Sequence, residues 1–231
     1  MDPVESIALW AVLFIGTHLL ISSTVIRPRL VGAVGDQPYR GIYSIVSLGT
    51  FIPLVVVFAR HKHAGPLLWN LRADAPLRWI AWLLMLLAFI LLIGGLVTPS
   101  PASMAAPAGG ARAPRGLLKI TRHPAFVAFA LFGFAHMILN GWLGDLIFFG
   151  TFPVLGIVGG KHQDARKLRD LGETYRRLVA VTSFFPGAAL VSGRQKWERD
   201  DMPWAAVGVG ALTTILIAIV HPWLFGGQPL G

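Results

Sequence analysis

The stretch GLLKITRHPAFVAFALFGFAHMILN, residues 116–140, decides how the rest of the chain is interpreted. It begins with basic residues, reaches Pro124, and then runs apolar except for His136 and Asn140. Proline is tolerated in the first turn of a helix, where its missing N–H is not needed. The stretch therefore predicts a membrane helix that begins at Arg122-His123-Pro124 and carries His136 in its interior.

The composition is that of an integral membrane protein. Of the 231 residues 55% are hydrophobic and only 13% are charged, which is about half the ~25% of a soluble domain. The 20 Lys and Arg residues, against 11 Asp and Glu, lie mostly in loops between apolar runs. This distribution is typical of membrane topology rather than of a nucleic-acid-binding surface. The absence of cysteine excludes thiolate metal sites and covalent attachment of haem.

The apolar runs predict an all-α, polytopic membrane helical bundle that forms one domain over residues 1–231. About six runs are candidates to cross the ~30 Å hydrocarbon layer. They are residues 7–26, 41–59, 79–97, 124–142, 146–160 and 203–224. Residues 98–116, rich in Pro, Ala and Gly, predict a flexible connector. Residues 161–199 form a basic segment whose first part is expected to lie along the membrane surface, and glycines in the fifth run indicate close helix packing.

The distribution of basic residues predicts an orientation. The loops after the first, third and fifth runs carry 16 Lys and Arg residues, and the two remaining loops and the two tails carry 4. The positive-inside rule then places these three loops in the cytoplasm. We therefore expect a multi-pass protein of the cytoplasmic (inner) membrane with both termini outside.

Two histidines lie deep within the apolar runs. Burying an ionisable side chain in a bilayer is costly, so His18 and His136 indicate a function or a specific partner. The alternative is a neutral imidazole that is hydrogen-bonded to a neighbouring helix. Gly133, three residues before His136, would leave room for a flat ligand, and Asn140 could orient the ring nitrogen. Ser22, four residues after His18, could do the same, as groups beside metal-bound imidazoles commonly do.

In a chain without cysteine, haem b held by histidine is the simplest cofactor hypothesis. His18 and His136 differ in expected depth by ~10 Å, and His18 with His123 would fit about as well. Spacing therefore leaves the pair open. His123 and Arg122 could contact a haem propionate, or they could belong to a helix start that faces lipid headgroups.

The other histidines carry weaker signals. We expect His61 and His63 in a solvated loop, and His162 and His221 near the membrane interfaces. A zinc site is not indicated, because the acidic residues are few and neither H-x₃-H nor H-E-x-x-H occurs.

Four segments together resemble one family of membrane proteins. They are FIGTHLLISS around His18, RPRLVGAVGDQPYRGIYSIVSL (27–48), KITRHPAFVAFALFGFAHMILNGWLGDLIFFG (119–150) and KHQDARKLRDLGETYRRLVAVTSFFP (161–186). In their order and residue sequence, these segments resemble those of the NnrU family of bacterial membrane proteins. That family also covers a plant 15-cis-zeta-carotene isomerase domain.

The resemblance implies haem b between two histidines that match His18 and His136. It also implies roles for the histidines that match His123 and, less directly, His61. In the isomerase branch, ferrous haem is proposed to act after a ligand switch and to assist rotation about a cis double bond of a polyene. The bacterial branch is named for a link to denitrification and nitric oxide metabolism. Isomerase activity for this chain is therefore an analogy from fold and site.

Two other classes of protein remain open. A helix starting RHP, followed by a basic helix and L-G-x-x-Y, also resembles isoprenylcysteine and phospholipid methyltransferases that use S-adenosylmethionine. Here Phe126 stands where that pattern has tyrosine, and Gln163-Asp164 stands where it has paired glutamates. The third class is a non-enzymatic membrane factor for assembly or for sensing haem or nitric oxide. Either enzyme class predicts an apolar substrate cavity, and the assembly factor predicts none.

The sequence thus favours a bilayer-embedded NnrU-like protein that binds haem b through His18 and His136. His123 and Arg122 are expected to support these ligands or to contact a propionate. The predicted chemistry is redox or cis–trans isomerase-type chemistry on a hydrophobic small molecule.

Overall fold

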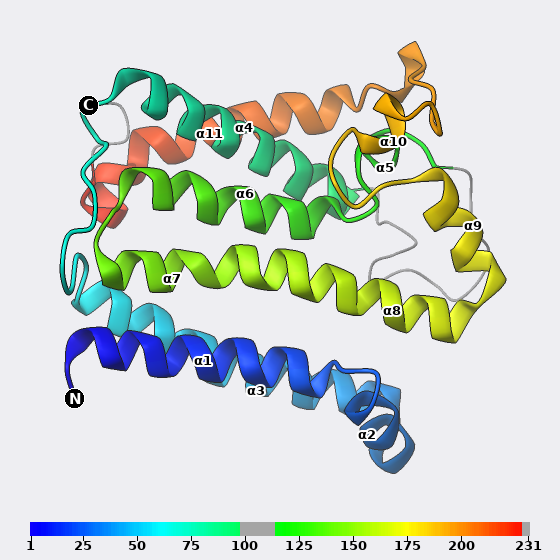
Figure 1. Cartoon of the computed structure of the whole chain (residues 1–231), viewed down its shortest axis with the longest axis horizontal. Coiled ribbons are helices and arrows are strands. Elements are labelled where there is room, and N and C mark those ends of the chain that lie inside the picture. The colour runs from blue at the N-terminus through cyan, green and yellow to red at the C-terminus, as the bar shows by residue number, and fades with distance from the viewer. Residues whose placement is uncertain (98–113, 228–231) are drawn as a thin grey trace.

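The computed structural model describes residues 1–97 and 114–227, and the regular elements of these residues are all helices (Figure 1). The predicted all-α fold is therefore confirmed. The connector predicted at residues 98–116 lies almost entirely outside the described residues.

Within the described part of the chain, five helices are long and apolar enough to cross a membrane, and a sixth, α6, is apolar but shorter. These helices are α1 (Pro3–Ile21), α3 (Asp36–Arg60), α4 (Ala75–Val97), α6 (Pro124–Leu139), the continuous helix α7–η1–α8 (Leu143–Leu171) and α11 (Trp204–Phe225). They pack side by side, and α1 begins at the end of the bundle where α11 finishes (Figure 1). We call this the terminal end.

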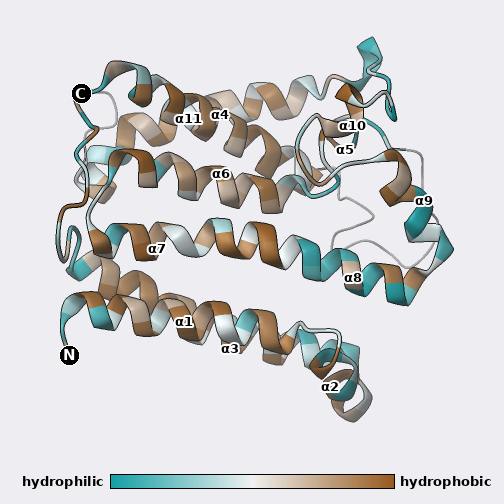
Figure 2. Cartoon of the chain, in the orientation of Figure 1, coloured by the Kyte–Doolittle hydropathy of each residue, from teal (hydrophilic) through white to brown (hydrophobic). Residues whose placement is uncertain are grey.

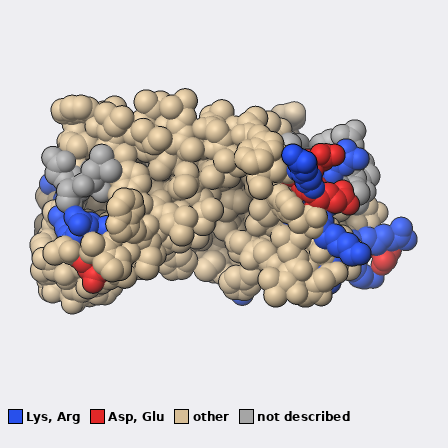
Figure 3. All heavy atoms as spheres, turned by 90° about the horizontal axis from the view of Figure 1, so that it is seen from above, with Lys and Arg blue, Asp and Glu red and all other residues tan. Residues whose placement is uncertain are grey.

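The opposite end of the bundle carries the short helices. They are α2 (Ile26–Val34), α5 (Leu117–Ile120), α9 (Glu173–Val181), α10 (Ala188–Val191) and the 3₁₀ turn η2 (Arg199–Asp201). Hydrophilic ribbon gathers at this end, notably in α8 and α9 (Figure 2). On the face shown in Figure 3, charged side chains lie at the two ends and leave a broad uncharged band between them.

The uncharged band is where lipid would contact the protein. Large apolar side chains on the outer faces of the helices are exposed, among them Ile45, Trp79 and Trp223. Exposed apolar surface on this scale is unusual in a soluble monomer. Helices whose backbone groups are paired internally are one of the few structures that can span hydrocarbon. The protein is therefore a membrane protein in a lipid environment.

Helix α1 begins and ends through local hydrogen bonds. The Asp2 side chain accepts from the Val4 N–H, and Glu5 accepts from the Asp2 N–H, which is a capping box. The helix ends at Ile21, so residues 22–25 of the first apolar run (7–26) form a turn, and its last residue, Ile26, begins α2. His18 consequently lies in the last turn of α1 rather than in the middle of a longer span.

Helix α6 packs closely against α4 on one side and α7 on the other. A Cβ at Gly133 would overlap Pro153 and the Phe149 carbonyl of α7, and a Cβ at Gly156 would overlap the Phe126 carbonyl of α6. The close packing predicted for the glycines of the fifth run is thus confirmed at Gly156. The room predicted beside Gly133 for a flat ligand is wrong, because α7 fills it.

The fifth apolar helix does not end near Gly160, as its composition indicated. Helix α7 (Leu143–Val154) passes through one π-helical turn, η1 (Leu155–Gly159), into α8 (Gly160–Leu171). Pro153 lies just before this turn and cannot donate a backbone hydrogen bond, and π turns and prolines are common causes of irregular helices. The start of the basic segment is therefore the continuation of a membrane helix.

Candidate functional site

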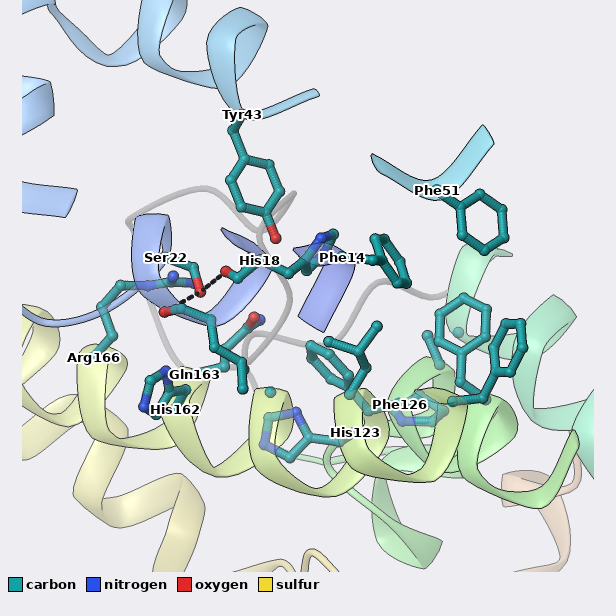
Figure 4. A pocket seen from close by; sticks show the side chains of 18 of the residues that line it. Phe14, His18, Ser22, Tyr43, Phe51, His123, Phe126, His162, Gln163 and Arg166 are labelled. Carbon is teal, nitrogen blue, oxygen red and sulfur yellow. Dashed lines mark hydrogen bonds between the residues drawn. The ribbon is translucent and has the colours of Figure 1, made fainter. Parts of the chain in front are cut away.

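A cavity of about 460 Å³ lies between α1, α3, the end of α4, the start of α6 and the α7–η1–α8 helix. This volume is within the usual range for small-molecule sites. Its aromatic lining includes Phe14, Phe51, Phe126, Phe129 and Phe152. Its polar lining includes His18, Tyr43, His123, His162, Gln163 and Arg166 (Figure 4). We call this part of the bundle the cavity end.

His18 lines the cavity with one ring nitrogen already engaged. Its Nδ1 lies 3.2 Å from the Ser47 hydroxyl of α3, and its ring packs against Phe14 and Tyr43. Ser22, which sequence reasoning assigned to orient the ring, instead donates to the His18 carbonyl oxygen at 2.7 Å. Among the described residues Nε2 has no hydrogen-bond partner. The second nitrogen of His18 is therefore available to a ligand.

His123 shares this cavity and is fixed by a carboxylate. Its Nε2 lies 2.6 Å from Asp164 Oδ1, and the residue is only 3% exposed. Asp164 also accepts hydrogen bonds from Arg122 and from the Tyr175 hydroxyl, the latter at 2.6 Å. Arg122, which was predicted to contact a propionate, thus uses some of its N–H donors to bind Asp164.

The Asp164 carboxylate was not recognised as a site residue in the sequence. Burial, followed by the neighbouring Asp164 carboxylate, raises the pKa of Tyr175, so the Tyr175 hydroxyl remains a donor to Asp164. The available signal was an acidic residue within a basic segment, placed eleven residues before Tyr175. Sequence spacing could not show that α8 and α9 fold back to bring both residues to the start of α6.

Two further α8 side chains enter the same cavity. The Nδ1 atom of His162 is buried and has no hydrogen-bond partner among the described residues. Arg166 follows one turn later and is 5% exposed. The sequence placed His162 at an interface and did not single out Arg166, because the extension of the fifth helix was not foreseen.

His136 lies in a different part of α6. Its Nδ1 is 2.8 Å from the Phe132 carbonyl oxygen, and its ring stacks on Phe149 with centroids 4.4 Å apart. Asn140 does not orient this ring as predicted, because its amide donates to the His136 carbonyl oxygen at 2.8 Å and accepts from Arg72. His136 does not line the cavity. The structure thus brings His18 together with His123 and His162, and the assignment of His136 as a ligand stays a prediction.

The terminal end holds a second histidine–aspartate pair. His63 Nδ1 lies 2.6 Å from Asp145 Oδ2, and the His63 backbone N–H donates to Asp145 Oδ1 at 3.1 Å. Asp145, in the first turn of α7, is 1% exposed. His63 is therefore attached to the bundle, with φ +60° in the left-handed region, although the sequence placed it in a solvated loop.

The donor set of the cavity fits haem b better than it fits S-adenosylmethionine. Neutral imidazole is a common axial ligand of haem iron, and His18 Nε2 and His162 Nδ1 lack partners among the described residues. The aromatic side chains match a flat apolar macrocycle. No aspartate or glutamate is found among the described residues that line the cavity, so the carboxylates that a sulfonium ligand favours are missing there.

Fold and site together define a polytopic α-helical membrane protein with a histidine-containing internal cavity. The chain belongs to the NnrU family, since the family model described as "NnrU protein" matches residues 6–229. The resemblance predicted from the sequence is confirmed.

Two curated relatives carry the name of an enzyme. The chain is 26% identical over 206 residues to "15-cis-zeta-carotene isomerase, chloroplastic" of Zea mays, covering 82% of this chain and 52% of the relative. It is 24% identical over 211 residues to the protein of the same name from Arabidopsis thaliana, covering 84% and 54%. The chain thus spans about half the length of these relatives. No solved structure matches it.

Proposed function

We propose that the protein binds haem b in the cavity, with His18 as an iron ligand, and carries out isomerase-type chemistry on a hydrophobic small molecule. The observation that supports this function best is an aromatic cavity that contains three imidazoles, each with a ring nitrogen that has no hydrogen-bond partner among the described residues. The similarity to proteins named 15-cis-zeta-carotene isomerase supports the choice of an apolar polyene as substrate class.

The protein groups have separable tasks in this proposal. Ser47 holds His18 Nδ1 and so directs Nε2 to the ligand. An Nε2–H of His123 that donates to Asp164 leaves Nδ1 as the unprotonated nitrogen of the neutral ring. The phenylalanines exclude water and hold an apolar chain. Bound haem would supply an iron centre whose axial ligands and surroundings set its reactivity.

The second iron ligand distinguishes two versions of the proposal. The family resemblance favours His136, whereas His123 and His162 are the imidazoles that share the cavity with His18. His123 and His136 are 13 residues apart on one helix, which is ~20 Å along its axis. A single iron therefore cannot bind both, and the choice can be made by experiment.

The test is the absorption spectrum of the detergent-purified protein, oxidised and dithionite-reduced, with a pyridine haemochrome count. We expect close to one haem b per chain. His18→Ala should lose most of it, and one of His123→Ala, His136→Ala and His162→Ala should change the spectrum most and thereby identify the second ligand. His63→Ala, at the terminal end, is the control and should keep the wild-type spectrum.

Two outcomes would contradict the haem proposal. One is a colourless protein purified from haem-replete cells. The other is a His18→Ala variant with the spectrum and haem content of the wild type. The methyltransferase and assembly-factor hypotheses would then be favoured. Binding of S-adenosylmethionine would support the methyltransferase, and its absence the assembly factor.

Isomerase activity has its own measurement. A cis-polyene hydrocarbon is offered in detergent or liposomes, and its isomers are separated chromatographically with oxidised and with reduced protein. Conversion that needs haem and is lost in His18→Ala would support the proposal. The link to nitric oxide that the family resemblance implies is tested separately, by a shift of the reduced spectrum when nitric oxide is added.

We also propose that the protein resides in the cytoplasmic membrane with both termini outside. The support is the concentration of Lys and Arg in the loops after the first, third and fifth apolar runs. Because the chain has no cysteine, single cysteines can report topology. Ser6→Cys should react with an impermeant maleimide in intact cells, and Ser192→Cys should react only after lysis. The reverse result would invert the orientation.

A further inference from the structure

Arg166 is a buried cation without a matching carboxylate. Its residue is 5% exposed and lines the cavity. Among the described residues no carboxylate lies within hydrogen-bond or ion-pair distance of its guanidinium. Asp170, one turn further along α8, pairs with Arg169 at 2.9 Å and lies 4.0 Å from Arg27. A buried charge without a partner is strongly unfavourable, so a carboxylate bound beside Arg166 would stabilise it.

The surroundings of Arg166 carry charges of both signs, and the Arg27 guanidinium acts on it more strongly than the Asp170 carboxylate does. The Arg27 guanidinium is close enough to repel it electrostatically, and Arg27 is itself paired with Asp36 at 3.1 Å. The partnerless Nδ1 of His162 lies one helical turn before Arg166 on the same cavity wall. This part of the cavity thus offers donors and positive charge, and we call it the cationic pole. It is suited to an anionic group.

The cavity is asymmetric. In Figure 4 Arg166 and His162 lie toward one side of the view, and Phe51 and Phe126 toward the other, with His18 between them. A ligand that fills such a cavity would have an acidic group at one end and an apolar body at the other. A pure hydrocarbon would fill only the aromatic part and would leave Arg166 unpaired.

We propose that the cationic pole binds the carboxylate of an acid-bearing apolar ligand and that Arg166 is its anchor. The guanidinium can bind a carboxylate through two parallel hydrogen bonds, which is the strongest common pairing for this group. The carboxylate has two possible sources, a propionate of haem or the head group of a long-chain fatty acid. The inference rests on the proposed function in that both concern the same cavity, but it does not require that haem be the occupant.

The experiment compares matched ligands that differ only in the acid. Protein prepared without haem is titrated with haem b and with haem dimethyl ester, and separately with oleate and with oleyl alcohol. The variants are Arg166→Gln and, as the control, Arg177→Gln, whose side chain is 79% exposed. We expect the wild type to favour one of the two acids over its neutral counterpart by about ten- to hundredfold, the usual effect of a hydrogen bond to a charged group.

The variants then locate the preference. Arg166→Gln should lose it, Arg166→Lys should keep part of it, and Arg177→Gln should keep all of it. A preference confined to the haem pair identifies a propionate, and one confined to the oleate pair identifies a fatty-acid head group. The inference is overturned if the wild type shows no preference in either pair, or if Arg166→Gln retains the full preference.

The same series separates this inference from the proposed function. If haem b does not bind but oleate is preferred over its alcohol through Arg166, the haem proposal fails and the anchor stands. If haem b binds and its dimethyl ester binds equally well, with no preference for oleate, the anchor fails and the haem proposal stands.

A stability measurement excludes a merely structural role. In ligand-free protein Arg166→Met removes a buried unpaired charge, so its thermal midpoint should be equal to or above that of the wild type. A clear decrease would mean that Arg166 stabilises the fold through contacts within the chain, and it would overturn its role as a ligand anchor.

Discussion

The two ends of the bundle contain the same pair of residues in different surroundings. At the cavity end His123 binds Asp164, and at the terminal end His63 binds Asp145, each with a nitrogen-to-oxygen distance of 2.6 Å. His123 is almost fully buried, whereas the side chain of His63 is 43% exposed. The two histidine–aspartate pairs thus have the same length but different burial. The role of each pair has to be inferred from the residues that surround it.

The partners of the two carboxylates differ. Asp164 accepts from Arg122, His123 and Tyr175, which belong to the start of α6 and to α9, and this cluster adjoins the cavity. Asp145 accepts twice from one residue, His63, through its ring and its backbone. It also lies in the first turn of α7, where negative charge is favourable. The first pair supports a site, and the second attaches a loop to a helix.

The largest expected effect is that of Asp164→Asn. The substitution leaves Arg122 and His123 buried beside a neutral amide, and breaking a buried ion pair typically costs about 3–5 kcal/mol. We expect a lower thermal midpoint in detergent together with a changed or lost haem spectrum. A variant that is destabilised but keeps the full wild-type spectrum would show that the cluster has no influence on the cavity.

Asp145→Asn is the counterpart at the terminal end. Its loss of charge weakens two hydrogen bonds to a carboxylate, each worth about 1.5–3 kcal/mol, but His63 is partly exposed and can be hydrated. We expect a destabilisation of about 2 kcal/mol. The haem spectrum should be unchanged at temperatures where the variant is folded. A spectral change as large as that of Asp164→Asn would remove the distinction between the two ends.

The packing of α6 on α7, between the two ends of the bundle, can be tested by substituting two glycines. Gly133→Ala should cost about 1–3 kcal/mol by overpacking, because its Cβ would overlap α7, whereas a Cβ at Gly150 has no neighbour within 4 Å. Gly150→Ala should be neutral or stabilising, since alanine favours helix by about 1 kcal/mol. Thermal midpoints of the two variants check the difference, and equal midpoints would contradict the described packing of α6 on α7.

The smallest expected effect is the acid sensitivity of a buried ion pair between α5 and η2. Lys119 Nζ lies 2.6 Å from Asp201 Oδ2, and both residues are buried. Burial alone would raise the pKa of Asp201, but hydrogen bonds from Lys119 and from backbone N–H groups lower it below its ordinary value of 3.8. Because the folded-state pKa is lowered, this stabilisation is present above about pH 4 and is lost as the pH falls further.

The loss is of the order of 1 kcal/mol for each unit by which the pKa is lowered. It is measured as the difference in unfolding midpoint between pH 5 and pH 3. The double variant Lys119→Met/Asp201→Leu should show a weaker dependence over that interval. If it has the same pH dependence as the wild type, this pair does not contribute to it.

The membrane helices could be predicted from the sequence because hydrocarbon leaves few alternatives. A run such as residues 79–97 has to form a helix to pair its backbone groups in lipid, and it lies within α4 (Ala75–Val97). The end of the fifth helix could not be predicted in the same way. Beyond Gly160 the composition becomes basic, and only the contacts of α8 show that Gln163 and Arg166 are buried on one face.

The sequence could predict the kind of residue in the candidate site, but not which residues come together there. Intramembrane histidines indicated function, and His18 and His123 do line one cavity. The expected partners Ser22 and Asn140 were wrong, because local spacing along a helix favoured residues that bond to the backbone instead. Ser47 takes the place of Ser22 at His18, and the Phe132 carbonyl takes that of Asn140 at His136. Ser47 at His18 and Asp164 at His123 come from distant parts of the chain, and no single-sequence pattern reports such tertiary contacts.

The π turn Leu155–Gly159 gives the fifth helix a change of register just before the cavity wall. One extra residue in a turn rotates everything that follows by about 100° relative to a regular α-helix. Deleting one residue within this turn would therefore re-aim His162, Gln163 and Arg166 together while leaving α7 in place. The polar chemistry of the wall is thus set by a single backbone irregularity, and an insertion or deletion there would alter ligand choice more than most side-chain substitutions.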